Sequence, residues 1–256
     1  MPIPVKILEQ YKEFSLKYKI AEKIQDQYTQ IDEESARAQG DYSTGGAHAE
    51  ALNREKLKQR RKLANEVEDD DGTVIEMFAG RGNLTNAVWK PHSKKNILIE
   101  YNADTVKEYT SKIVDPDRSV IYQMSNIDFA EEHLKEIPPE DITAIDFDAF
   151  GSVIPIITKT LEHFKPVRPL VVGITDGIGS NLVRISRQKD ELLNRLTELG
   201  YVPMAREGLN MNMYMIKVIS KTMELIAKDH GLSCEKINGT HNRKSTVYCG
   251  YVLKPL

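Results

Sequence analysis

The chain has few of the residues on which metal-binding and disulfide-rich proteins depend. It contains only two cysteines, Cys234 and Cys249, and they lack the C-x-x-C spacing that zinc ligands often show. We therefore expect neither a zinc site nor a disulfide framework, and we predict two reduced thiols in a C-terminal β region. None of the six histidines belongs to an H-x-x-x-H or H-E-x-x-H pattern, so no metal is predicted.

Long apolar runs and a large excess of one charge are also missing. No apolar run approaches the roughly 18 residues that a membrane-spanning helix needs, and the amino terminus lacks the apolar segment of a signal peptide. We expect a cytoplasmic protein with no membrane partner, and the oligomeric state stays open. The formal net charge of −3 predicts no global attraction to nucleic acid, although a local basic patch is compatible with it.

What the chain does have is a globular composition, with 256 residues of which 40% are hydrophobic. The first quarter is more polar than the rest. It is predicted to form a helix over 5–38, a loop over 40–48 and a second helix over 48–66. Six of the nine residues in Arg54–Lys62 are basic, which makes this run a candidate for phosphate contacts. We predict an N-terminal helical extension over 1–70 and a second domain over 71–256.

From Thr73 onward, strands and helices alternate. The candidate strands are β-branched or apolar, as strands buried on both faces should be, and they cover 73–78, 96–101, 119–124, 142–147 and 169–175. The candidate helices cover 83–90, 103–114, 129–136, 152–164, 180–199 and 211–229. Two further strands, about 232–238 and 245–254, are predicted to form an antiparallel hairpin through Gly239–Asn242. This order predicts an α/β fold with a Rossmann-like sheet of five parallel strands and a C-terminal antiparallel hairpin.

The segment TVIEMFAGRGNLT, Thr73 to Thr85, predicts a site for a nucleotide-like cofactor. Gly80 and Gly82 let the backbone approach a ligand, and the helix that follows points free N–H groups toward it. A dinucleotide fingerprint would have a third glycine where Thr85 stands. Glu76 would repel a phosphate but suits an ammonium or sulfonium group, and S-adenosylmethionine carries both.

Further polar residues follow the next strands. Glu100 comes 18 residues after Gly82, where an acid can accept hydrogen bonds from ribose hydroxyls, and Tyr101 can stack beside adenine. Asn126 follows the third strand, whereas Asp128 is expected to cap the next helix. The predicted cofactor-binding residues are Glu76, Phe78, Ala79, Gly80, Gly82, Asn83, Glu100, Tyr101, Asn126, Ile127 and Asp146.

The fourth strand ends in DFDAFGS, Asp146 to Ser152, at the sheet edge where open α/β folds bind their ligands. The Asp148 carboxylate can accept a hydrogen bond from an exocyclic amine and so direct the nitrogen lone pair toward a methyl donor. Phe150 can stack on a planar base. A helix cap at Asp148 is the alternative interpretation. The predicted catalytic residues are Asp148, Phe150 and Asp146.

EMFAGRGNLT resembles the first conserved segment of the class I S-adenosylmethionine-dependent methyltransferases. DFDAFGS resembles the DxDPFGS segment of the tRNA guanine dimethyltransferases that modify an exocyclic amine, and it is similar to the DPPY-type segment of amino-methylating DNA and RNA enzymes. Ala149 stands where those families have proline. The resemblance covers about residues 73–175 and the terminal hairpin loosely.

The resemblance implies an S-adenosylmethionine-dependent N-methyltransferase that acts on an exocyclic amine of a nucleobase in tRNA-like RNA or in DNA. RNA is slightly preferred because of the DxDxFGS resemblance. Three alternatives stay open: a non-catalytic nucleic-acid-binding subunit on a methyltransferase scaffold, a small-molecule methyltransferase, and an NAD-type oxidoreductase. Thr85 and the DFDAFGS edge are evidence against the last of these.

Overall fold

The computed structural model describes residues 46–68, 71–80, 82, 84–112, 117–149, 151–177, 182, 189–205, 208–241 and 246–256. The helix predicted over 5–38 lies outside these residues, as does most of the predicted loop over 40–48. The second predicted helix corresponds to α3 (Gly46–Ala64), which packs on the central sheet. The domain boundary at residue 70 stays a prediction.

A mixed sheet of seven strands forms the centre of the molecule, in the order β3-β2-β1-β4-β5-β7-β6. The strands are β1 (Thr73–Glu76), β2 (Lys95–Ile99), β3 (Ser119–Tyr122), β4 (Ile142–Asp148), β5 (Leu170–Asp176), β6 (Leu232–His241) and β7 (Val247–Pro255). The first five are parallel, whereas β7 runs antiparallel to both β5 and β6. The predicted Rossmann-like sheet with a C-terminal antiparallel hairpin is therefore confirmed.

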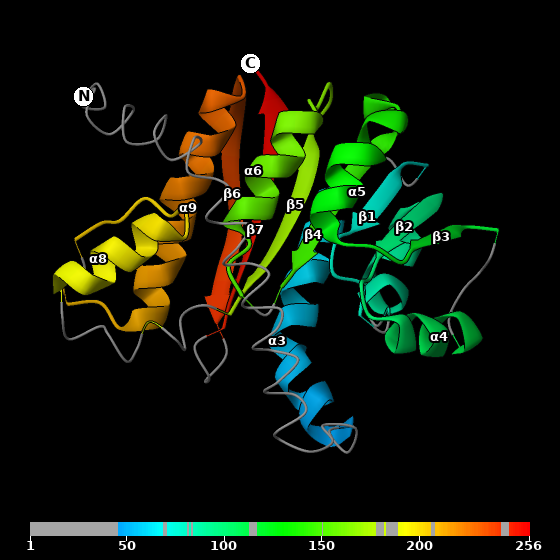
Figure 1. Ribbon diagram of the computed structural model, residues 1–256, viewed down its shortest axis with the longest axis horizontal. Helices are drawn as coiled ribbons and strands as arrows, with labels where there is room; N and C mark the ends of the chain where they lie inside the picture. Colours follow the sequence, from blue (N-terminus) through cyan, green and yellow to red (C-terminus); the bar gives the residue numbers. More distant parts are fainter. Residues whose placement is uncertain are drawn as a thin grey trace.

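Helices cover both faces of the sheet, and α5 and α6 lie in front of it in Figure 1. The elements between the strands are η2 (Thr85–Trp89), η3 (Lys90–His92), α4 (Ala103–Lys112), α5 (Asn126–Glu132), η4 (Leu134–Glu136), η5 (Pro139–Asp141), α6 (Ile154–His163), α8 (Lys189–Glu198) and α9 (Met211–Asp229). Successive strand residues point to opposite faces. In β1, Ile75 joins a core with α5, α6 and α9, and Val74 joins a second core with α3 and η2.

Two glycines make room for α3 on the second face of the sheet. Gly173 of β5 and Gly250 of β7 are partners in the antiparallel register. A Cβ atom at Gly173 would lie 2.8 Å from Arg60 Nε, and one at Gly250 would lie 2.4 Å from a methyl carbon of Leu63. A larger residue at either position would therefore require Arg60, Leu63 or the helix itself to shift. The glycine pair lets the helix backbone lie close to these strands.

Three local predictions differ from the structure. Helix α5 begins at Asn126 because the Ser125 hydroxyl accepts a hydrogen bond from the Asp128 backbone N–H, so Ser125 rather than Asp128 is the N-cap. Strand β6 continues to His241, so most of the predicted turn belongs to the ladder with β7. The helix predicted over 83–90 is a single π-helical turn, η2, followed by the 3-10 turn η3.

The two cysteines lie in β6 and β7, as predicted, and both are free thiols. Burial raises the pKa of Cys249 to about 11 and that of Cys234 to about 12. Within the part of the chain that the structure describes, no helix is long and apolar enough to cross a membrane. Across the same residues, no three His, Cys, Asp or Glu side chains are grouped as a metal ion would require.

Candidate active site

The glycine turn after β1 leaves open space at the carboxyl edge of the sheet. Gly80 and Gly82 have φ of +53° and +68°, in the left-handed region that glycine adopts without a steric penalty. A Cβ atom at Gly80 would meet no described residue within 4 Å. The Gly80 N–H donates to Glu100 Oε2 at 2.9 Å, so the turn and the end of β2 are joined directly. The structure thus brings together two of the predicted cofactor-binding positions.

Glu100 is held in place by backbone and is still only partly buried. Its Oε1 accepts a hydrogen bond from the Asn102 N–H at 2.8 Å, and the Asn102 side chain caps α4 through the N–H groups of Asp104 and Thr105. Tyr101, between them, is 63% exposed. The Tyr101 ring is therefore available to a ligand at this edge.

Other predicted cofactor residues follow the ends of β1 and β3. The Ala79 side chain is buried, and its N–H donates to the Ile99 carbonyl at 2.9 Å. Phe78 and Ile127 are half-buried and pack against the main core, while Asn126 begins α5. Asn83 and Phe150 lie outside the described residues.

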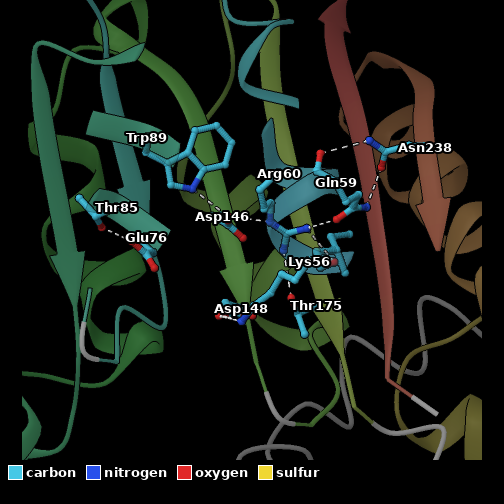
Figure 2. Close-up of polar contacts among 11 residues, drawn as sticks. Lys56, Gln59, Arg60, Glu76, Thr85, Trp89, Asp146, Asp148, Thr175 and Asn238 are labelled. Atoms are coloured by element: carbon cyan, nitrogen blue, oxygen red, sulfur yellow. Dashed lines mark hydrogen bonds and ion pairs between the residues drawn. The ribbon is translucent and has the colours of Figure 1, made fainter. Parts of the chain in front are cut away.

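Asp146 is the centre of a buried polar network on the α3 face of the sheet (Figure 2). Its Oδ2 accepts hydrogen bonds from Arg60 Nε at 2.7 Å and from Trp89 Nε1 at 2.9 Å, and both ion-pair side chains are 0% exposed. Arg60 also donates to Gln59 Oε1, the Ile174 carbonyl and Thr175 Oγ1. Although burial disfavours the charged guanidinium, the Asp146 carboxylate raises the pKa of Arg60.

Asp148, two residues further along β4, pairs with a second cation from α3. Lys56 Nζ donates to Asp148 Oδ2 at 2.7 Å, and the side chains are 13% and 15% exposed. Figure 2 shows Lys56 and Arg60 reaching from α3 toward the strand end that carries both aspartates. The predicted catalytic residues Asp146 and Asp148 therefore have different surroundings, one fully enclosed and one at the rim.

Glu76 of β1 is a third carboxylate in this region. It is 2% exposed, stands opposite Asp146 in the β1–β4 register, and accepts a hydrogen bond from the Thr85 hydroxyl. Burial, together with the negative charge of Asp146, raises the pKa of Glu76 well above its usual range. Thr85, which occupies the place of a third glycine in the turn, therefore orients the acid.

We expect Glu76→Gln to raise the thermal stability of the protein at pH 7.5. Because the folded-state pKa of Glu76 is raised, ionisation of this carboxyl destabilises the fold as the pH rises through that pKa. Glutamine removes the ionisation and keeps an acceptor for Thr85. Each 1 kcal/mol gained would raise Tm by about 2–4 °C. Thermal unfolding between pH 5 and pH 8 measures the difference, which should shrink toward low pH.

A Glu76→Gln variant that is less stable than the wild type at pH 7.5 would contradict this account of the buried acid. Thr85→Val is the matched variant, because it removes the hydroxyl that donates to Glu76 and leaves the carboxyl in place. It should lower Tm at every pH in the range, since a buried acceptor then lacks its donor.

Lys56 and Arg60 are the site residues that the sequence analysis did not identify. The basic run Arg54–Lys62 was a candidate for phosphate contacts. Lys56 and Arg60 instead form ion pairs inside the molecule, whereas Lys58, Arg61 and Lys62 are exposed. The four-residue spacing of Lys56 and Arg60 puts them on one face of a helix. That spacing was a signal in the sequence, although its partners on β4 were not evident from it.

Comparisons with known proteins show the fold. No protein-family model matches the sequence. No curated protein matches it either. The structure of Trm1 from Pyrococcus horikoshii with S-adenosyl-L-methionine is similar with a TM-score of 0.60 and 13% identity, over 79% of this chain and 55% of that chain. This chain thus spans about half the length of that protein.

Two other solved structures are similar at lower scores. TYW2 from Pyrococcus horikoshii, in complex with MeSAdo, has a TM-score of 0.46 and 18% identity, over 77% of this chain and 61% of that one. The N-methyltransferase NodS from Bradyrhizobium japonicum has a TM-score of 0.47 and 10% identity, over 80% and 98%. The strand order and the similarity to Trm1 together show that this chain has a Rossmann-like α/β fold of the kind found in that structure.

Proposed function

We propose that this protein is an S-adenosylmethionine-dependent N-methyltransferase. It acts on an exocyclic amine of a nucleobase in tRNA-like RNA or in DNA. The observation that carries the proposal is the position of Asp148. It ends β4 at the carboxyl edge of the sheet, next to the strand that leads into the open glycine turn. Ligands of open α/β sheets bind at this edge, where the strand order reverses.

The residues at the edge fit the proposed cofactor. The open space at Gly80 can admit a ligand, the partly exposed Glu100 can accept from ribose hydroxyls, and Tyr101 can cover adenine. Asp146 Oδ1 is a buried oxygen without a hydrogen-bond partner among the described residues, so negative potential remains there. When bound, S-adenosylmethionine would supply an electrophilic methyl group. The similarity to Trm1, which was solved with that molecule, supports this assignment.

The side chains of the protein would act by positioning the acceptor amine. Asp148 accepts a hydrogen bond from the acceptor amine, directs the nitrogen lone pair, and stabilises the positive charge that develops on the nitrogen. Asp146 is enclosed, so it acts through Arg60 and Trp89 by holding the end of β4 in place. Phe150, by its place in DFDAFGS, is the candidate for stacking on the base.

Exposed cations on α3 are candidates for contacts with nucleic acid. Lys58, Arg61 and Lys62 point away from the buried network and can reach phosphates. Because such contacts release counterions, binding of an RNA acceptor should weaken steeply with salt. The preference for RNA over DNA rests on the DxDxFGS resemblance.

The experiment that tests the proposal is transfer of a radiolabelled methyl group from S-adenosylmethionine to total tRNA, rRNA and DNA, followed by identification of the modified nucleoside. Label in an N-methylated base of RNA or DNA is the expected result. Tight binding of NAD with no calorimetric response to S-adenosylmethionine would overturn the proposal in favour of an oxidoreductase.

One observation favours a second candidate, the non-catalytic nucleic-acid-binding subunit. The Asp148 carboxylate already has a cationic partner, Lys56, on one of its two oxygens. Such a subunit would retain oligonucleotides in a binding assay and transfer no methyl group to any of the three pools. A small-molecule methyltransferase would bind S-adenosylmethionine and retain no oligonucleotide.

A further inference from the structure

The ion pair between Lys56 and Asp148 joins the helix α3 to the predicted acceptor edge. Its Nζ–Oδ2 distance is 2.7 Å, and both side chains are at least four-fifths buried. A pair at this depth is shielded from water more than an ordinary surface salt bridge, so its geometry is better defined. The other lysines of α3, Lys58 and Lys62, are exposed. Lys56 is thus set apart from the surface cations of the same basic run.

The spacing of the two cations matches the spacing of the two aspartates. Lys56 and Arg60 are one helical turn apart, and four helical residues rise about 6 Å. Asp146 and Asp148 lie on one face of β4, and two strand residues rise about 6.6 Å. In the structure the inner cation, Arg60, pairs with the inner acid, Asp146, and the outer cation, Lys56, pairs with the outer acid, Asp148.

Helix α3 is anchored so that the Lys56 backbone has a fixed position. Arg60 is fully buried and bonded to both β4 and β5, and Leu63 packs against Gly250 of β7. Gln59 Nε2 donates to Asn238 Oδ1 of β6 at 2.6 Å. These contacts span four strands of the sheet, so α3 cannot slide without breaking a buried ion pair.

We propose that Lys56 is a positioning residue for the acceptor amine, an inference that rests on the proposed function of Asp148. By donating to Oδ2, Lys56 holds the carboxylate in one rotamer and leaves Oδ1 to accept from the amine. A carboxylate has about four lone-pair sites on its two oxygens, so one ammonium group does not exhaust it. Lys56 contacts neither the acceptor nor the methyl donor in this scheme, and acts through Asp148.

Kinetics of Lys56→Met and Lys56→Arg test this role. We expect Lys56→Met to lower kcat about 10-fold to 100-fold with the acceptor KM nearly unchanged, since misplacing a catalytic group affects the reaction more than binding. Lys56→Arg should recover part of kcat, because arginine also donates to a carboxylate. Unchanged or increased kcat in Lys56→Met would overturn the inference and identify Lys56 as a competitor of the amine.

Lys221→Met is the matched control. Lys221 Nζ pairs with Glu224 at 3.1 Å on the surface of α9, so the same substitution removes an ion pair outside the site. Its kcat and KM should equal those of the wild type. Thermal unfolding of all variants checks that Lys56→Met is folded at the assay temperature. A fall of kcat in Lys221→Met equal to that in Lys56→Met would contradict a specific role for Lys56.

Lysine footprinting tests the ion pair without any catalysis. In the full chain, acetylation by an amine-reactive ester, followed by mass spectrometry, should modify Lys56 about tenfold more slowly than Lys221, because a charge-assisted hydrogen bond and burial protect it. Asp148→Ala should remove much of that protection. Equal reactivity of the two lysines in the wild type would overturn the inference about Lys56 and leave the proposed function unaffected. Absence of methyl transfer to every acceptor pool would instead contradict the proposed function, and with it the role of Lys56.

Discussion

Replacement of Arg60 by methionine should lower the free energy of unfolding by about 3–5 kcal/mol, the range for removing one partner of a buried ion pair. For a chain of this size the fall in Tm should be roughly 6–20 °C. The reason is that Asp146 is enclosed at 0% exposure and, among the residues that the structure describes, would keep only the Trp89 N–H as a donor to its charged carboxylate. Methionine preserves most of the packing volume, so the loss of charge dominates. Urea and thermal unfolding measure the effect.

Two variants separate the ion pair from other causes. Arg61→Met changes the next residue of α3, which is exposed, and should stay within about 0.5 kcal/mol of the wild type. Arg60→Met with Asp146→Asn removes both charges and should recover a large part of the stability, since asparagine still accepts from Trp89. If the double variant is no more stable than Arg60→Met alone, the buried charge of Asp146 is not the cause.

Asp148→Ala should reduce methyl transfer by about 10²–10⁴-fold, the range for loss of a positioned catalytic group. Binding of S-adenosylmethionine should be nearly unchanged, because Asp148 lies on the acceptor side of the proposed site. Asp148→Asn should have intermediate activity, since its amide oxygen still accepts a hydrogen bond from an amine but carries no charge. Initial rates of label transfer and calorimetric titration of the cofactor measure the two properties separately.

Glu100→Ala provides the comparison for Asp148→Ala. Glu100 accepts from the Gly80 N–H and is the proposed partner of the ribose, so its loss should weaken cofactor binding. If Asp148→Ala weakens cofactor binding as much as Glu100→Ala does, the acceptor edge has been assigned to the wrong strand. The Tm of Asp148→Ala should fall by less than that of Arg60→Met, because Lys56 is 13% exposed, whereas Arg60 is 0% exposed, and Lys56 can turn toward water.

Much of the fold could be predicted from local features of the sequence. Helix α9 was expected over 211–229, and the structure has Met211–Asp229, with the Asn210 side chain capping its first turn. The five parallel strands were recognisable because strands covered on both faces are nearly continuous apolar runs. Errors occurred at element ends, as at α5, where the hydroxyl of Ser125 and not the carboxylate of Asp128 caps the helix.

The candidate site could be predicted only in part. The positions of Glu76, Gly80, Glu100 and Asp148 follow from the rule that parallel strands bring their carboxyl ends to one edge of a sheet. The different surroundings of Asp146 and Asp148 do not follow from it, since both aspartates belong to one short segment of sequence. Burial depends on what covers the strand, and the cover here comes from α3 and η2.

The sequence by itself determined the sheet, its edge and the glycine turn. The spacing of apolar residues, the presence of β-branched residues and the tolerance of glycine for positive φ all concern residues that are close together in the chain. Only the tertiary structure decided that Lys56 and Arg60 are site residues and not surface cations. Their partners are 92 and 86 positions away along the chain, and a helical spacing of charges does not say which surface will face them. The glycine pair of β5 and β7 leaves room at the sheet for Arg60 and Leu63 of α3.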